Sequence, residues 1–210
     1  MSNECKTPMD LARLYGSRVY LSGAMERALD VGEGWRNRIT PYLDRLGIVV
    51  LNPCKKPIDM VFKIEDREYR EGLRMDGDFE TLNKEVRILR AVDLRLVDIS
   101  DFLIVYLDNE VSSCGTWEEI VTANRQKKPV LIHCKQGKER IPDWLWGMLP
   151  HQFIFGSWDD LFEYLRQVNI ADEIDNMRRW MFFDYSSMVP KISVSQSVLE
   201  STFGGLDSIV

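Results

Sequence analysis

The sequence predicts an α/β fold in which parallel strands alternate with helices. Short runs that are almost continuously apolar, and rich in β-branched or aromatic residues, recur along the chain, as is typical of strands covered on both faces. The segments between these runs carry apolar residues at helical spacing. This alternation favours an open sheet with right-handed crossovers.

Five runs are the strand candidates, and four segments are the helix candidates. The strand candidates are RVYLSG (18–23), GIVVLNP (47–53), DFLIVYLD (101–108), KPVLIHC (128–134) and HQFIFGS (151–157). The helix candidates are residues 33–46, 79–97, 116–126 and 159–168. We therefore expect a flavodoxin- or Rossmann-like doubly wound sheet of about five parallel strands with flanking helices.

One domain followed by a tail is the expected organisation, because 210 residues suit a single domain. The α/β domain is assigned to residues 1–168. Within it, the charged stretch 54–78 is longer than most connections in such folds, and we interpret it as an insertion or lid near the second strand. The tail is assigned to residues 169–210, with a helix expected at 171–185 and a Ser-rich end.

Composition disfavours several classes of partner. Hydrophobic residues make up 45% of the chain and charged residues 29%, without an apolar run long enough to span a bilayer, so no membrane is expected. The start, MSNECKTPMD, lacks the features of a secretory signal, which favours a cytoplasmic location. A net charge of −6 with scattered basic residues disfavours nucleic acid. The four cysteines are far apart and form no CxxC pair, so neither a disulfide framework nor a metal site is expected.

The chain has only two histidines, which restricts the chemistry. His133 lies within an apolar run and His151 follows a proline, so both are expected to be structural. A Ser/His or Cys/His nucleophile is thereby disfavoured, and carboxylates become the natural acid and base. The first strand is followed by a single glycine, and no GxxxxGK[ST] motif occurs, so dinucleotides and nucleoside triphosphates are disfavoured.

Ligands of open parallel sheets bind beyond the carboxyl ends of the strands, where this chain carries small polar residues. After the third predicted strand, Gly115 permits a tight turn. The hydroxyl of Ser113 or Thr116 can cap the helix expected at 116–126. The exposed N–H groups of that helix offer an anion site. The candidate binding residues are Ser22, Gly23, Asn52, Ser113, Gly115 and Thr116.

Glu118 and Glu119 are expected in the first turn of that helix, where the helix dipole would keep a carboxylate ionised and nucleophilic. Adjacent helical residues point roughly 100° apart, so only one of the two can face the strand ends. From these residues alone, helix stabilisation by both glutamates is the simpler explanation.

Asp93 lies among apolar residues of the 79–97 segment. A carboxyl group buried near the strand ends could hold a proton. An ion pair with Arg90 or Arg95 is the alternative.

The ordered set of motifs resembles the nucleoside 2-deoxyribosyltransferase family. The resembling features are VYLSG at 19–23, the Asp93-x7-Asp101 spacing leading into FLIVYL, the GTxxE pattern of 115–119, and ANRQKKPVLI at 123–132, within a span of roughly 18–165. The glutamate that ends this pattern is the family's nucleophile, so the resemblance selects Glu119 over Glu118.

The resemblance implies a two-step reaction. Glu119 would attack the anomeric carbon and displace the base, while Asp93 would hold the base and supply its proton. A second base, or water, would then attack the glycosyl-enzyme with retention of configuration. Tyr20, at the family's first-strand tyrosine position, would hold Glu119 by a hydrogen bond; an ordinary strand aromatic is the alternative.

Ser113 departs from the family pattern. Transferases that act on free nucleosides often carry an aspartate six residues before the nucleophile, where this chain has Ser113. Serine there resembles the branch that hydrolyses deoxynucleoside 5′-monophosphates, and a hydroxyl beside a helix N-terminus suits a phosphate. A plain turn residue is the alternative.

Active sites in this family commonly receive a group from a neighbouring subunit, supplied by the loop after the fourth strand. Here a short helix is expected after Pro142, carrying Asp143, Trp144 and Trp146. Asp143 is a candidate substrate contact in a homo-oligomer with shared active sites. For the tryptophans, a place in the core or in a dimer interface is the alternative.

The expected function is cleavage of the N-glycosidic bond of deoxynucleosides with transfer of the 2-deoxyribosyl group to another base. The partners are then a nucleoside or nucleotide and a free base, and neither a metal nor an organic cofactor is needed. The first alternative is a hydrolase of nucleoside 5′-monophosphates that releases free base. The second is a nucleotide-binding module without catalysis.

Overall fold

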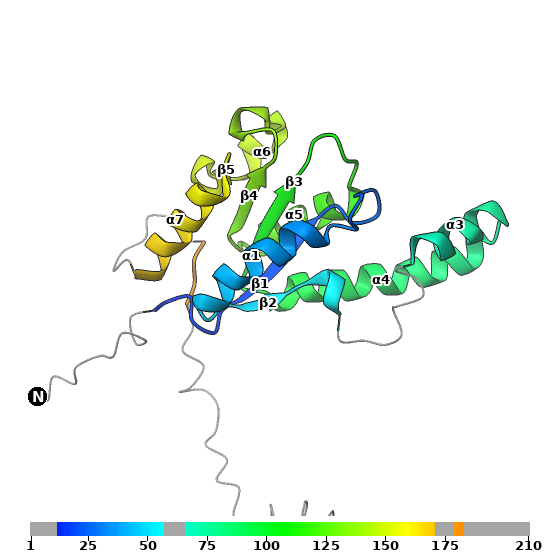
Figure 1. The fold of residues 1–210 in the computed structure, drawn as a ribbon, viewed down its shortest axis with the longest axis horizontal. Helices are drawn as coiled ribbons and strands as arrows, with labels where there is room; N and C mark the ends of the chain where they lie inside the picture. The colour runs from blue at the N-terminus through cyan, green and yellow to red at the C-terminus, as the bar shows by residue number, and fades with distance from the viewer. Residues whose placement is uncertain (1–11, 57–65, 171–178, 183–210) are drawn as a thin grey trace, which may run out of the picture. The chain divides into compact units, whose positions relative to one another are not determined.

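A five-stranded parallel sheet forms the centre of the computed structural model, which describes residues 12–56, 66–170 and 179–182 (Figure 1). Its strands are β1 (Arg18–Gly23), β2 (Val49–Leu51), β3 (Phe102–Leu107), β4 (Val130–Cys134) and β5 (Ile154–Phe155). They are arranged in the order β2-β1-β3-β4-β5, and all neighbouring strands are parallel. This order reverses direction between β1 and β3, which confirms the predicted doubly wound α/β fold.

Helices cover both faces of the sheet. The α-helices are α1 (Glu33–Arg45), α3 (Arg67–Met75), α4 (Phe79–Ile99), α5 (Cys114–Arg125), α6 (Asp143–Met148) and α7 (Trp158–Ile170), and short 3₁₀ helices are η2 (Pro53–Lys55), η4 (Lys138–Arg140) and η5 (His151–Phe153). Residues of α1 and α7 pack into the apolar cluster on one face. Residues of α4, α5 and α6 pack into the cluster on the other face.

Strand β1 shows how the two clusters are divided. Val19 and Leu21 are fully buried in the cluster of α1 and α7, whereas Tyr20 is buried in the cluster of α4 and α5. Successive side chains of a strand point to opposite faces, so a continuously apolar run serves both layers. Burying one large aliphatic side chain stabilises the fold by about 1.5–3 kcal/mol.

The predicted insertion contains a helix that was not expected. Helix α3 begins after Asp66, whose carboxylate accepts a hydrogen bond from the backbone N–H of Glu68 at 2.9 Å. Figure 1 shows α3 beside the N-terminal part of α4, beyond the edge of the sheet. Within the predicted insertion at 54–78, α3 therefore forms a helical hairpin with the start of α4, which follows the insertion.

A fully buried arginine fixes the turn after β1. The Arg36 guanidinium donates hydrogen bonds to the backbone carbonyls of Leu21 at 3.1 Å, Gly32 at 2.7 Å and Gly23 at 3.0 Å. A Cβ atom on Gly23 would lie 3.0 Å from the Trp35 ring and 3.1 Å from the carbonyl oxygen of Tyr106. A side chain at this position would require its neighbours to shift by a few tenths of an ångström, so close packing favours glycine at the end of β1.

Four aromatic rings stack beside this turn. Trp35 lies 5.4 Å from Tyr106 and 5.9 Å from Trp158, measured between ring centroids. The His133 ring lies parallel to that of Trp158, with 4.2 Å between centroids. Burial lowers the pKa of His133, so the imidazole is neutral within the stack.

Contacts divide the chain into two compact units, Met1–Trp180 and Met181–Val210. In the first unit, the indole N–H of Trp180 donates a hydrogen bond to the Tyr164 hydroxyl at 2.8 Å. The helix expected at 171–185 lies outside the described residues except for 179–182, which are not helical.

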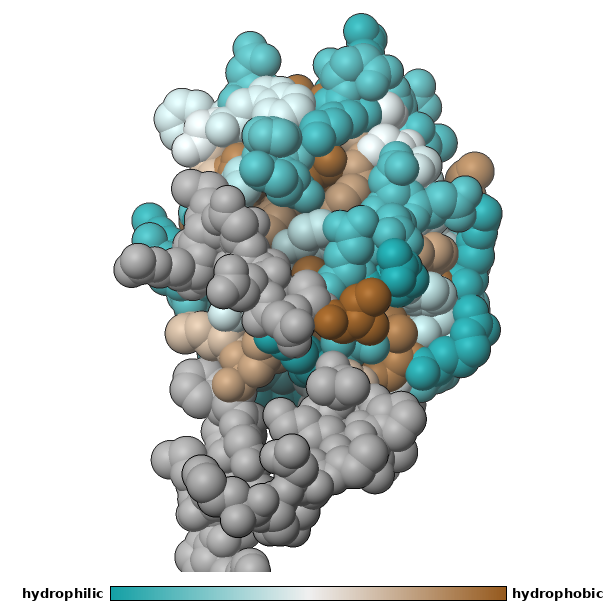
Figure 2. Space-filling model, turned by 90° about the vertical axis from the view of Figure 1, so that its left-hand side faces the viewer, coloured by the Kyte–Doolittle hydropathy of each residue, from teal (hydrophilic) through white to brown (hydrophobic). Residues whose placement is uncertain are grey.

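On the side of the domain that carries α7, the described surface is largely hydrophilic, and its hydrophobic areas are small and separate (Figure 2). Among the described helices, none combines the length and the apolar character that crossing a membrane requires.

Candidate active site

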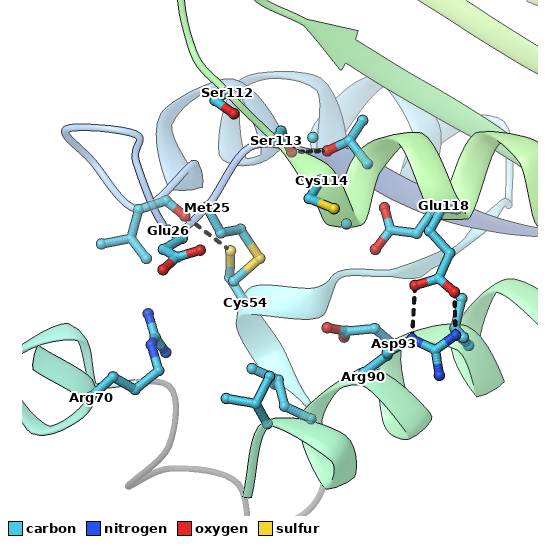
Figure 3. A pocket seen from close by; sticks show the side chains of 18 of the residues that line it. Met25, Glu26, Cys54, Arg70, Arg90, Asp93, Ser112, Ser113, Cys114 and Glu118 are labelled. Carbon is cyan, nitrogen blue, oxygen red and sulfur yellow. Dashed lines mark hydrogen bonds and ion pairs between the residues drawn. The ribbon is translucent and has the colours of Figure 1, made fainter. Parts of the chain in front are cut away.

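A cavity of about 440 Å³ opens at the carboxyl ends of β1, β2 and β3 (Figure 3). Its volume is in the range of pockets that bind small molecules. It lies at the topological switch point, where ligands of doubly wound sheets bind. The polar lining residues include Glu26 after β1, Lys56 after η2, Arg70 and Arg74 on α3, Arg90 and Asp93 on α4, and Ser112, Ser113, Thr116, Glu118 and Glu119 at the start of α5.

Glu119 is the buried carboxylate of this cavity, with 9% of its surface exposed. The Tyr20 hydroxyl donates a hydrogen bond to its Oε1 at 2.9 Å, and the Ser22 hydroxyl donates one to its Oε2 at 2.5 Å. Tyr20 and Ser22 are two residues apart on β1, so their side chains leave the same face of the sheet. The hydrogen bond expected between Tyr20 and Glu119 is present.

Burial raises the pKa of Glu119 from 4.5 to about 7, although the hydrogen bonds from Ser22 and Tyr20 lower it. The charge of Asp93 raises this pKa further, and that of Arg36 lowers it. Burial, followed by the neighbouring Glu119, also raises the pKa of Tyr20 well above its ordinary value, so Tyr20 remains a neutral donor.

Two expectations about this helix are wrong. Helix α5 begins at Cys114 rather than Thr116, so Glu119 lies in the second turn and not in the first. The helix dipole acts mainly on the first turn, and desolvation outweighs it here. Ser113 occupies the N-cap position but makes no capping hydrogen bond, because its hydroxyl is hydrogen-bonded to the Thr116 hydroxyl instead.

Glu118 points to α4, away from β1. The Arg90 guanidinium donates two hydrogen bonds to the Glu118 carboxylate, one of them from Nε at 2.8 Å, as Figure 3 shows. The hydrogen bond from Arg90 lowers the pKa of Glu118. This confirms that only one of the two adjacent glutamates faces the strand ends.

Asp93 lines the cavity from α4, with its carboxyl directed toward the cavity (Figure 3). The Lys56 ammonium lies 2.8 Å from its Oδ1, and the exposed fractions are 2% for the Lys56 side chain and 19% for that of Asp93. Asp93 therefore forms an ion pair with Lys56. Arg90, one of the two arginines expected as alternative partners, binds Glu118 instead. Lys56 was not predicted as a site residue, although its position shortly after the second strand marked it as a neighbour of the strand ends.

The remaining predicted residues divide into two groups. Gly23, Ser113, Gly115 and Thr116 line the cavity with Glu119 and Asp93. Asn52 does not line it: its side-chain oxygen accepts a hydrogen bond from the backbone N–H of Cys54 at 2.9 Å and caps η2. Asp143 is the first residue of α6 and is exposed, and it is not among the lining residues of this cavity.

Within the part of the chain that the structure describes, no group of three or more His, Cys, Asp or Glu side chains is arranged to hold a metal ion.

Fold and site together define a doubly wound α/β domain with a buried carboxylate, held by two hydroxyl donors, in a cavity at the switch point. Similar solved structures include a 2-deoxyribosyltransferase from Bacillus psychrosaccharolyticus, at 16% identity over 75% of this chain and 100% of that chain, with a TM-score of 0.48. Another is the 2-deoxyribosyltransferase from Leishmania mexicana, at 16% identity over 70% of this chain and 95% of that chain, with a TM-score of 0.49. No protein-family model and no curated protein matches the chain.

Proposed function

We propose that this protein is an enzyme that cleaves the N-glycosidic bond of deoxynucleosides and transfers the 2-deoxyribosyl group to another base. The observation that carries the proposal is the buried Glu119 carboxylate at the switch-point cavity, with hydroxyl donors on both of its oxygens. The two donors fix the carboxylate in one orientation, as covalent catalysis requires of a nucleophile. The sequence motifs at Asp93 and Glu119 support the same reaction class.

In the first step, a Glu119 oxygen attacks the anomeric carbon, and the electron pair of the C–N bond leaves with the base. Asp93 contacts that base from the opposite wall. In the second step, the acceptor base attacks the glycosyl-enzyme from the face that the first base left. Two displacements at one carbon give net retention.

A second copy of the chain would supply Asp143. Asp143 is exposed, and the neighbouring Trp144 side chain is 80% exposed, as expected of residues that contact another subunit. We include a homo-oligomer with shared active sites in the proposal. Size-exclusion chromatography with light scattering tests the assembly, and Asp143→Ala tests whether turnover depends on this residue.

Hydrolysis of deoxynucleoside 5′-monophosphates is the second candidate. It is favoured by the start of α5, where Ser113, Cys114 and Gly115 line the cavity without a side-chain cap on their N–H groups. Arg70 and Arg74 also line the cavity, which adds positive charge, although Arg74 is paired with Glu26 at 2.8 Å. A binding module without catalysis is the third candidate.

Product analysis separates the three candidates. The protein is incubated with thymidine, deoxyadenosine, deoxycytidine and their 5′-monophosphates, each with and without free adenine, and the products are identified by chromatography. New deoxynucleoside that forms only with a second base supports the transferase. Free base released from monophosphates alone supports the hydrolase, and ligand binding without any product supports the binding module.

Trapping the glycosyl-enzyme tests the nucleophile. A 2-fluoro-substituted nucleoside should leave its sugar on the peptide that contains Glu119, detected by mass spectrometry. Glu119→Gln should lose turnover by at least about 10³-fold while still binding ligand, whereas Glu118→Gln is the matched control and should retain most turnover. Labelling at Glu118, or none with a substrate that turns over, would overturn the assignment.

A further inference from the structure

The family resemblance gives Asp93 the role of supplying the proton for the departing base, and the proton on Asp93 needs a source of its own. The inference drawn here rests on the proposed function. It concerns Lys56, whose ammonium is buried against Asp93 at 2.8 Å, with 2% of the side chain exposed. Lys56 lies directly after η2, whereas Asp93 lies on α4, so the pair joins two walls of the cavity.

An ammonium at this distance favours the carboxylate form of Asp93, because opposite charges stabilise each other strongly where solvent is excluded. Asp93 then touches the base as a hydrogen-bond acceptor and carries no proton of its own. The Lys56 ammonium, 2.8 Å from Asp93 Oδ1, carries a proton within hydrogen-bond distance of this carboxylate.

The other charged groups of the described lining residues are less suited to supply this proton. Glu119 must be ionised to act as the nucleophile. Glu118 is bound by Arg90, Glu26 is bound by Arg74, and Glu33 is an exposed residue at the start of α1. Guanidinium groups do not release protons near neutral pH.

We propose that Lys56 is the proton source for the leaving base and acts through Asp93. As the C–N bond breaks, Lys56 Nζ gives a proton to the Asp93 carboxylate, and the Asp93 carboxyl gives that proton to the base nitrogen. Asp93 ends as a carboxylate, Lys56 ends as a neutral amine, and the base leaves as a neutral molecule. In the second step the acceptor base gives up its N–H proton along the same path, which restores the ammonium.

Two substrates distinguish this role from a structural one. Deoxyadenosine requires protonation of its base, whereas a 4-nitrophenyl 2-deoxyriboside releases a nitrophenolate that needs no proton. The variants are Lys56→Met, which removes both charge and proton, and Lys56→Arg, which keeps the charge beside Asp93 but does not release a proton. Lys55→Met is the matched control, because Lys55 is the exposed neighbour.

Both Lys56 variants should lose deoxyadenosine turnover by about 10²- to 10⁴-fold, the usual contribution of general acid catalysis, and keep nitrophenyl turnover within about tenfold of wild type. Lys55→Met should resemble wild type on both substrates.

Three results would overturn the role of Lys56. Recovery of deoxyadenosine turnover in Lys56→Arg would mean that only the charge matters, and equal loss on both substrates would mean a structural role. Unchanged turnover in Lys56→Met would exclude any role. If Lys56→Met does not fold, as judged by circular dichroism, the turnover of Lys56→Arg on the two substrates decides whether Lys56 supplies the proton. A wild-type protein that is inert on both substrates would instead overturn the proposed function itself.

Discussion

Replacing Glu119 by glutamine is expected to stabilise the fold above neutral pH while it abolishes activity. Burial raises the pKa of Glu119 to about 7 in the folded protein, whereas the unfolded chain releases this proton near 4.5. Between these values the folded state binds more protons than the unfolded state, so the free energy of unfolding of the wild type falls as the pH rises. Glutamine does not titrate, and the variant lacks this loss.

The size of the effect follows from the two pKa values. Each pH unit between them corresponds to about 1.4 kcal/mol, so the interval from 4.5 to about 7 corresponds to roughly 3 kcal/mol. Glutamine can keep the hydrogen bond from Tyr20 through its carbonyl oxygen, and the Ser22 hydroxyl can turn to accept from its amide. The stability gained by the variant relative to wild type should therefore grow by roughly 3 kcal/mol across this interval and stay constant above it.

Urea denaturation at pH 5, 6, 7 and 8 measures this difference. Glu118→Gln is the control, because the hydrogen bond from Arg90 lowers the pKa of Glu118 and its contribution is lost only below about 4.5. The difference between Glu118→Gln and wild type should thus be constant from pH 5 to pH 8. A Glu119→Gln difference that is equally constant would refute the reasoning that burial controls the ionisation of Glu119.

The kcat/KM of the wild type should rise toward a plateau above about pH 7 as Glu119 ionises. Tyr20→Phe should move this rise to higher pH, because the variant loses a hydrogen bond that lowers the Glu119 pKa. A pH–rate profile checks both outcomes, and a rise at the same pH in Tyr20→Phe would contradict the second. Arg36→Met should lower the free energy of unfolding by about 2–4 kcal/mol, because three buried carbonyls lose their hydrogen-bond donor. Urea denaturation measures this change, and an unchanged free energy of unfolding would contradict the role of Arg36 in the turn. The wild type should lose stability as the pH falls below 6.5, the ordinary pKa of histidine, because the folded state keeps the His133 imidazole neutral while the unfolded state takes up a proton. His133→Phe should lack that part of the loss. Urea denaturation at pH 7 and pH 5 compares the two proteins.

The sheet could be predicted because its signal is local. A strand buried on both faces is a short apolar run, and each of the five runs contains a strand of the structure. The predicted ends of the helices were less accurate than the predicted strands. Gly115 was expected to form a turn but adopts helical conformation, so α5 starts at Cys114 rather than Thr116. Helix α3 is highly charged and was interpreted as part of an insertion, although the Asp66 N-cap and the i, i+4 spacing of Tyr69 and Leu73 are helix signals.

The site could be predicted only in part, because its properties depend on contacts between distant segments. The motif selected Glu119, but its pKa is raised by burial and lowered by hydrogen bonds from residues 97 and 99 positions away on β1. Arg36 and Lys56 are charged residues in polar stretches and look solvated in the sequence, yet both are buried. A buried charge of this kind depends on partners that local spacing does not reveal.

The two donors to Glu119 belong to a strand whose other side chains form the core. Tyr20 itself is part of the apolar cluster beneath α5, and its neighbours Val19 and Leu21 fill the opposite one. A shift of β1 by a single residue would exchange the two faces and remove both hydroxyls from the carboxylate. The hydrogen bonds to Glu119 thus depend on the folding of the whole domain, whereas the residues of α3 belong to neither apolar cluster. Under the proposed function, sequence change in α3 would alter the cavity wall and leave the hydrogen bonds to Glu119 in place.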